Sequence, residues 1–141
     1  MKTLYKTKAI SVGGRDGGKV RIENSPLEFE MAVPKEMGGS GKGGTNPEQL
    51  FAAGYAACFE SAFRGVARRK NLELKSASVA VEIGIGPSGK GGYSLSANIV
   101  ATVSGIDQAT ADTLVQEAHK VCPYSNATRG NIEVAVSARI E

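Results

Sequence analysis

Two cysteines and one glycine-flanked arginine are the residues of this sequence best suited to redox chemistry. Cys58 lies in the segment NPEQLFAAGYAACF, Cys122 lies in HKVCPYSNATRGN, and Arg15 lies in GGRDGG. The thiolate is the form of cysteine that attacks other atoms or binds metals, so the surroundings of each thiol decide what it can do. Each cysteine is therefore either a reactive thiol or a small residue of the hydrophobic core.

Cys58 lies in the middle of an apolar segment, where burial would raise the pKa of its thiol. A thiol with its ordinary pKa of about 8.5 is only slightly ionised at neutral pH, so a reactive Cys58 requires a nearby cation. Arg15 is a candidate for that cation, because the glycines on both sides leave its side chain little obstructed. The alternative for Arg15 is an exposed loop residue with no such role.

Cys122 precedes Pro123 and a run of turn-forming residues. This position predicts a thiol at a helix break that is partly accessible and able to move. A mobile thiol near a buried one can capture a sulfenic acid as a disulfide before further oxidation occurs.

His119 lies three residues before Cys122, which leaves a cysteine–histidine nucleophile pair open. The favoured interpretation is a partly exposed histidine near a helix C-terminus, where its cation suits the helix dipole.

Two cysteines and a single histidine are too few for a convincing zinc site, so no metal is expected. The glycine-rich loop at 38–44 precedes its helix by too many residues to match a nucleotide-binding fingerprint.

The composition predicts one globular domain spanning residues 1–141. Hydrophobic residues make up 41% and charged residues 22%, and the net charge of +3 is too scattered to indicate a nucleic-acid partner. Lysines interrupt the N-terminal segment, which argues against an export signal, and the apolar segment 50–59 is too short to span a membrane. We therefore expect a cytoplasmic protein, in a reducing compartment where a purely structural disulfide would not persist.

Periodicity predicts an α+β fold with the element order βββαββαβ. Alternating apolar residues predict strands at 4–11, 19–24, 27–33, 79–85, 95–103 and 132–140, and helical patterns cover 46–70 and 107–122. Asn46 can cap the first helix, Pro47 suits its first position, and Glu48 adds negative charge to its first turn. We expect one six-stranded, curved antiparallel sheet around this central helix. Because the helix is apolar on nearly every face, a second copy should cover the rest of it in a homodimer.

The two cysteine segments together resemble the OsmC/Ohr family, and specifically its organic hydroperoxide resistance branch. The similarity spans essentially the whole chain, and GGRDG supplies the arginine loop expected upstream. The resemblance implies an organic hydroperoxide reductase in which Cys58 attacks the peroxide, Cys122 resolves the sulfenic acid, Arg15 stabilises the thiolate and Glu48 orients Arg15.

The resemblance also implies an intertwined homodimer that needs no metal or flavin cofactor. Its reductant would be a dithiol, with lipoyl groups carried on proteins as the expected electron donors. An organic substrate requires apolar walls around the site, for which the candidates are Phe29, Met31, Met37, Tyr55 and Phe59.

Two other classes of protein remain as alternatives. One is a thiol hydrolase or acyltransferase that uses Cys58 or Cys122 with His119, and the other is a non-enzymatic binding module whose cysteines are core residues. A thiol count before and after one equivalent of an alkyl hydroperoxide separates the three.

Overall fold

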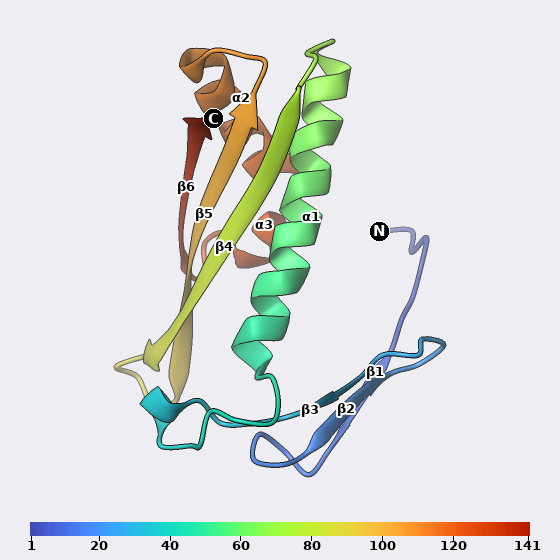
Figure 1. Ribbon diagram of the computed structural model, residues 1–141, viewed down its shortest axis with the longest axis vertical. Coiled ribbons are helices and arrows are strands. Elements are labelled where there is room, and N and C mark those ends of the chain that lie inside the picture. Colours follow the sequence, from blue (N-terminus) through green and yellow to red (C-terminus); the bar gives the residue numbers. More distant parts are fainter. The chain divides into compact units, whose positions relative to one another are not determined.

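The computed structural model describes residues 1–141 and has the predicted α+β composition (Figure 1). The chain divides into two compact units, Met1–Leu50 and Phe51–Glu141. In chain order its elements are β1 (Ala9–Val12), β2 (Lys19–Ile22), β3 (Glu28–Glu30), the 3₁₀ turn η1 (Lys35–Met37), α1 (Pro47–Arg69), β4 (Ser76–Pro87), β5 (Tyr93–Ser104), α2 (Gln108–Val121), α3 (Pro123–Thr128) and β6 (Glu133–Ile140). None of the helices is both long and apolar enough to cross a membrane.

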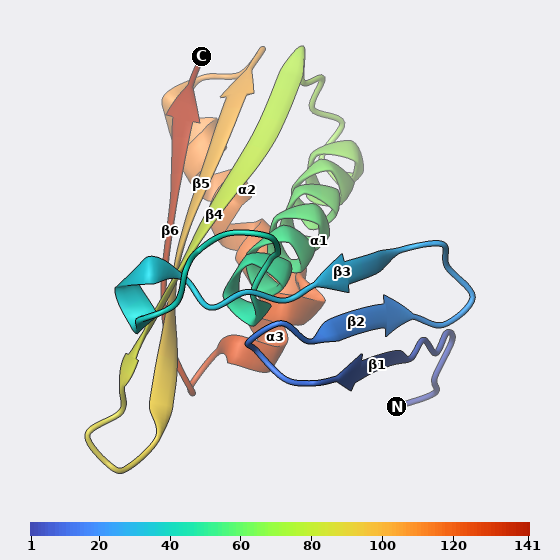
Figure 2. The ribbon, with the colours of Figure 1, turned by 60° about the horizontal axis from the view of Figure 1, so that its bottom comes forward.

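The strands form two three-stranded sheets, so the prediction of a single six-stranded sheet is wrong. The first sheet has the order β1-β2-β3 with antiparallel pairing throughout (Figure 2). Lys19 on β2 forms ion pairs with Glu28 and Glu30 of β3. Period-two alternation marks each strand but carries no information about which sheet it joins.

The second sheet has the order β4-β5-β6, and its last pair is parallel. β4 and β5 form a long antiparallel hairpin, as predicted. β6 follows α2 and α3, which act as a crossover connection and return the chain in the direction of β5. The sequence predicts mostly antiparallel pairing, and the pair formed by β5 and β6 is the parallel exception among these strands.

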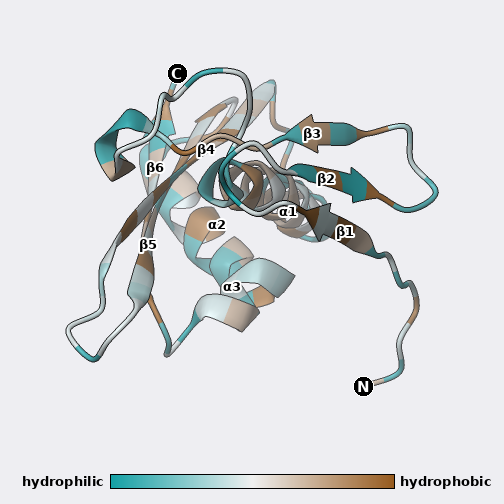
Figure 3. Ribbon diagram, turned by 90° about the horizontal axis from the view of Figure 1, so that it is seen from below, coloured by the Kyte–Doolittle hydropathy of each residue, from teal (hydrophilic) through white to brown (hydrophobic).

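The core of residues 51–141 lies between this sheet and the helices that cover it. The buried residues of α1 recur at the spacing of one helix face, and alternate residues of β5 meet them. Figure 3 shows the resulting alternation of hydrophobic and paler stretches along β5. Ala53, Ala57 and Ser61 leave another stripe of α1 exposed.

The start of α1 is set by the residues predicted to cap it. The side-chain Oδ1 of Asn46 accepts a hydrogen bond from the backbone N–H of Gln49 at 2.8 Å, and Pro47 occupies the first helical position. The helix then continues without a break to Arg69. Glu48 and Cys58 are consequently ten residues apart on one continuous helix.

Candidate active site

The two cysteines of the chain face each other within the unit formed by residues 51–141. Cys58 lies in the middle of α1, and Cys122 lies at the junction between α2 and α3. Both thiols are free, and their sulfur atoms are 3.7 Å apart. A disulfide bond is about 2.05 Å long, so a modest movement of the two sulfurs would close one.

Their accessibility is the reverse of the sequence prediction. Cys122 is fully buried with 0% exposure, whereas Cys58 is only half-buried. The turn-forming residues after Cys122 do not open the chain, because Pro123 begins the short helix α3 instead. The backbone of Cys122 is held on both sides, donating to the carbonyl of Ala118 and accepting from the N–H of Asn126.

The immediate surroundings within this unit do not by themselves activate Cys58. Burial raises the pKa of the Cys58 thiol above its ordinary value, and the neighbouring Cys122 raises it further. The backbone N–H of Tyr124, in the first turn of α3, acts in the opposite direction and lowers this pKa. Ionisation of Cys58 at neutral pH therefore calls for additional positive charge.

Sequence reasoning missed the aromatic side chain of Tyr124, which lies against α1 close to Cys58. Its ring stacks on Phe51 with centroids 6.0 Å apart and lies 5.6 Å from the ring of Tyr55. Gly54 permits this approach, since a Cβ at that position would be only 2.9 Å from the Tyr124 hydroxyl. An otherwise unexplained glycine one helical turn before Cys58 was the available signal.

Arg15 and Glu48, the other two predicted site residues, are joined to each other within residues 1–50. The two guanidinium nitrogens of Arg15 donate to the two carboxylate oxygens of Glu48 at 2.9 and 2.6 Å. This is the two-pronged geometry in which arginine binds a carboxylate most strongly. Hydrogen bonds from Arg15 hold the pKa of Glu48 below its ordinary value, so Glu48 is a carboxylate at neutral pH.

The arginine lies in the turn between β1 and β2. Gly14 and Gly17 flank it with φ angles of 74° and 75°, a conformation that glycine adopts without strain. The glycines predicted to keep Arg15 unobstructed therefore also shape the turn that carries it.

Three of the five residues suggested as apolar walls are buried. Tyr55 and Phe59 have 0% exposure and pack in the hydrophobic core of residues 51–141. In the other unit, Met31 is 5% exposed and Met37 is 37% exposed, while Phe29 is half-buried.

His119 is the half-buried histidine near the C-terminus of α2 that the sequence predicts, but its surroundings disfavour the charged form of its ring. Its Nδ1 lies 2.8 Å from the hydroxyl of Ser125, and its ring packs beside Phe59. Burial lowers the pKa of His119, and the charge of Arg129 lowers it further. The desolvation cost of an imidazolium here outweighs its attraction to the helix C-terminus.

This lowered pKa predicts a loss of stability on acidification. His119 takes up its proton more readily in the unfolded chain, so its contribution is fully present above about pH 6.5 and is lost as the pH falls through the folded pKa. Urea unfolding midpoints should fall between pH 7.5 and pH 5.5, and less so in His119→Asn, which cannot titrate. The pKa of Glu48 is also lowered, so Glu48 takes up its proton only at a pH below this range and does not affect the comparison. Equal losses in both proteins would contradict the assignment.

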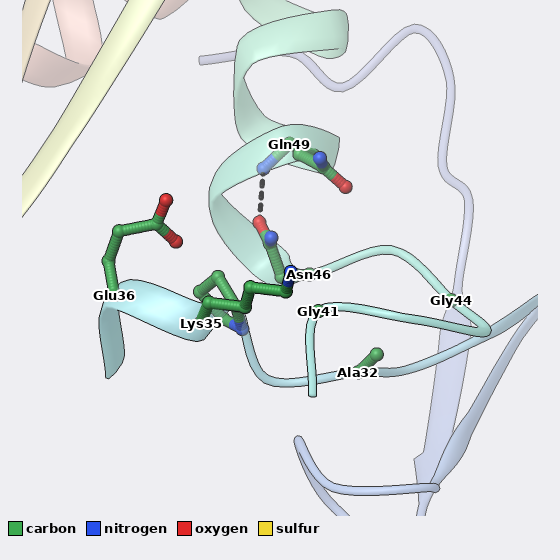
Figure 4. A pocket seen from close by; sticks show the side chains of 8 residues that line it. Ala32, Lys35, Glu36, Gly41, Gly44, Asn46 and Gln49 are labelled. Atoms are coloured by element: carbon green, nitrogen blue, oxygen red, sulfur yellow. Dashed lines mark hydrogen bonds between the residues drawn. The ribbon is translucent and has the colours of Figure 1, made fainter. Parts of the chain in front are cut away.

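The glycine-rich loop at 38–44 lies between η1 and α1. It folds beside the start of α1 around a hollow of about 260 Å³, with Lys35 and Glu36 on one side and Asn46 and Gln49 on the other (Figure 4). The side chain of Asn46 is already engaged in capping α1. No group of His, Cys, Asp and Glu side chains in the chain is arranged to hold a metal ion.

A facing pair of free thiols, set between one sheet and its covering helices, defines an α+β protein of the OsmC type. The family model described as OsmC-like protein matches residues 39–137. The chain therefore belongs to the OsmC-like family, and its curated relatives identify the organic hydroperoxide resistance branch within it.

One such relative is the "Organic hydroperoxide resistance protein" of Xanthomonas axonopodis pv. citri (strain 306). It is 47% identical over 137 residues, which cover 96% of this chain and 95% of the relative. OhrB of Bacillus subtilis (strain 168) is 38% identical over 96% of this chain and 98% of its own.

Solved structures agree with these relatives. An organic hydroperoxide resistance protein from Elizabethkingia anophelis has a TM-score of 0.95 and 44% identity, with 100% of both chains covered. A second, from Legionella pneumophila, has a TM-score of 0.92 and 46% identity over 97% of this chain and 98% of that one.

Proposed function

We propose that this protein is a thiol-dependent peroxidase that protects the cell by reducing organic hydroperoxides to alcohols. The observation that carries the proposal is the pair of free thiols 3.7 Å apart, one half-buried and the other fully buried. The names of the relatives supply the substrate class, since the curated relatives are organic hydroperoxide resistance proteins.

The reaction would proceed in three balanced steps. The Cys58 thiolate attacks the terminal oxygen of ROOH, the O–O bond breaks, and the departing alkoxide takes a proton to become ROH, leaving a sulfenic acid. The thiol of Cys122 then attacks the sulfur of that sulfenic acid, and water leaves as the disulfide forms. An external dithiol, such as a lipoyl group carried on a protein, returns two electrons by exchange and becomes a disulfide itself. This cycle uses no metal or flavin cofactor.

In this mechanism Arg15 supplies the positive charge that Cys58 requires, and Glu48 orients Arg15. The two-pronged contact between Glu48 and Arg15 supports the second role. The role of Arg15 is supported by the raised pKa of Cys58, since a thiol in that environment reacts at neutral pH only if a cation stabilises its ionised form.

Arg15→Ala is expected to slow the reaction with an alkyl hydroperoxide near neutral pH by at least about tenfold, and high pH should restore part of the rate. Removing the guanidinium raises the pKa of the Cys58 thiol, so the thiolate becomes available only under alkaline conditions. Stopped-flow rates measured from pH 6 to pH 10 test this. A profile that coincides with wild type would assign Arg15 to the surface of the protein.

Cys122→Ser tests the proposed function most directly, because it separates the first step from the second. The variant should still reduce one equivalent of cumene hydroperoxide, but its intact mass should rise by one oxygen atom, whereas wild type should lose two hydrogens. Excess peroxide should then carry the variant to the sulfinic acid. If wild type keeps both free thiols after this treatment, the peroxidase proposal fails.

The same experiment distinguishes the peroxidase from the two alternative functions. A thiol hydrolase or a binding module would not form the intramolecular disulfide. The contact of His119 with Ser125, together with its lowered pKa, also gives little support to a histidine that activates a cysteine for hydrolysis.

A further inference from the structure

Four polar side chains form a continuous hydrogen-bonded network within the otherwise apolar core of residues 51–141. The hydroxyl of Tyr55 lies 2.9 Å from that of Ser125 and 3.2 Å from that of Thr128. The Nδ1 of His119 lies 2.8 Å from the same Ser125 hydroxyl. Tyr55 and Ser125 have 0% exposure and Thr128 has 6%, so the two bonds of Tyr55 form away from solvent, whereas His119 is half-buried.

The network is fully satisfied, and its hydrogen-bond directions require a proton on Nδ1 of His119. Thr128 donates its hydroxyl proton to the carbonyl of Ser125, so Tyr55 must donate to Thr128 and Ser125 must donate to Tyr55. The remaining contact then requires His119 to donate from Nδ1 to Ser125. Four bonds thus use four protons in one consistent direction, and no buried side-chain nitrogen or oxygen of the chain lacks a partner.

The network connects the two chain segments that carry the thiols. Tyr55 precedes Cys58 by three residues on α1, His119 precedes Cys122 by three residues on α2, and Ser125 follows Cys122 by three residues on α3. Each of these residues is therefore about one helical turn from a reacting sulfur. The bond between Tyr55 and Ser125 ties α1 to α3 at the level of the sulfur pair.

A second contact fixes the segment after Cys122 to the helix before it. The guanidinium of Arg129 donates to the backbone carbonyl of His119 at 2.5 Å and to the side chain of Asn126 at 2.8 Å. Hydrogen bonds made by residues before and after Cys122 thus hold both of the segments that flank it. Stability alone does not call for this arrangement, since apolar groups of the same shape can replace a buried hydrogen-bonded pair at little cost.

We infer that the network of Tyr55, Ser125, His119 and Thr128 positions Cys122 for disulfide closure, which makes Tyr55 and Ser125 positioning residues of the resolving step. This inference rests on the proposed function, because it concerns the second step of that reaction. The sulfenic acid of Cys58 has two competing fates: attack by Cys122, which releases water, or oxidation by a second peroxide to a sulfinic acid. Holding the two sulfurs near contact favours the first, since closure depends on a reactive geometry.

The test uses single-turnover reactions of the full-length protein with cumene hydroperoxide, in which peroxide loss reports the first step. Disulfide closure is followed by acid quench, alkylation and intact mass. Tyr55→Phe removes one hydroxyl and keeps the ring packing, and Ser125→Ala removes the hydroxyl at the centre of the network. Ser61→Ala is the matched control, because Ser61 is an exposed serine of α1 three residues after Cys58 that bonds only to the carbonyl of Ala57.

The first step is expected to keep its wild-type rate in all variants, within about twofold. Closure should slow by at least about tenfold in Tyr55→Phe and Ser125→Ala, with more sulfinic acid under excess peroxide, and should be unchanged in Ser61→Ala. In the double variant the slowing of closure should be less than the two single effects combined, because both changes remove the bond between Tyr55 and Ser125.

Wild-type closure rates in both network variants would overturn the inference while leaving the peroxidase function intact. Equal slowing of both steps would also overturn it, since the network would then be structural only. If Ser125→Ala fails to fold, Tyr55→Phe decides between these outcomes. A wild-type protein that forms no disulfide would remove the proposed function and the inference together.

Discussion

Cys58→Ser is expected to lose all measurable reduction of organic hydroperoxides. A serine hydroxyl is not ionised at neutral pH and cannot form a sulfenic acid, so the first proposed step has no substitute in the chain. Cys122 is the only other thiol, and its sulfur is fully buried. The measurement is steady-state consumption of cumene hydroperoxide with dihydrolipoamide as reductant, which should fall to the rate without enzyme.

Cys122→Ser is the matched control for this loss, because it also replaces one sulfur by oxygen but leaves the attacking thiol in place. It should retain a single turnover that Cys58→Ser lacks. Substantial turnover by Cys58→Ser would show that the attacking group lies elsewhere, and the mechanism would have to be abandoned.

Mixing Cys58→Ser subunits with Glu48→Gln subunits is expected to give more activity than either parent. The two residues lie ten positions apart on the unbroken helix α1, which separates their backbones by about 15 Å and turns them about 80° apart. If both serve one reaction centre, as we propose, Cys58 must come from one chain and Glu48 from another. In the homodimer that we expect from the sequence, a mixed pair of subunits would contain one site with both residues intact.

The control for this experiment is a mixture of Glu48→Gln subunits with subunits that carry both substitutions, in which no site can be complete. Subunit exchange is verified by native mass spectrometry before activity is compared. If exchange occurs and activity stays at the level of the Glu48→Gln parent, the shared site is wrong. Glu48 would then have a structural role, since α1 has no break that could bring it to Cys58 in the same chain.

The local signals in the sequence predicted the elements after residue 46 well, except for α3, whereas β1 and β3 are shorter than the strands predicted at 4–11 and 27–33. Asn46 and Pro47 located the start of α1, and alternation located β4, β5 and β6, because these signals depend on neighbours in the chain. The parallel pairing of β6 with β5 could not be predicted, because strand direction depends on the path of the intervening helices. Pro123 was interpreted only as the end of a helix, although proline is equally suited to the first position of the next one.

The candidate site, too, could be predicted only in part: its residues could be named from the sequence, but their arrangement could not. Residue types made Cys58, Cys122 and Arg15 candidates, and the family resemblance added Glu48. The structure pairs these residues as two cysteines and one salt bridge. The polar network could not be predicted, because Tyr55 looks like any aromatic core residue and Ser125 like any turn residue. Only the folded chain brings their hydroxyls to 2.9 Å across 70 positions of sequence.

The unequal exposure of the two sulfurs has a consequence for the kinetics of the whole cycle. With Cys122 sealed in the core, a disulfide between them would offer an incoming thiol only the Cys58 sulfur, and Cys122 would be the leaving group. Peroxide and reductant would then use the same entrance, so they could not be bound together and turnover would be ping-pong. A monothiol would stall as an adduct on Cys58, whereas a dithiol carries its own second sulfur to expel the product.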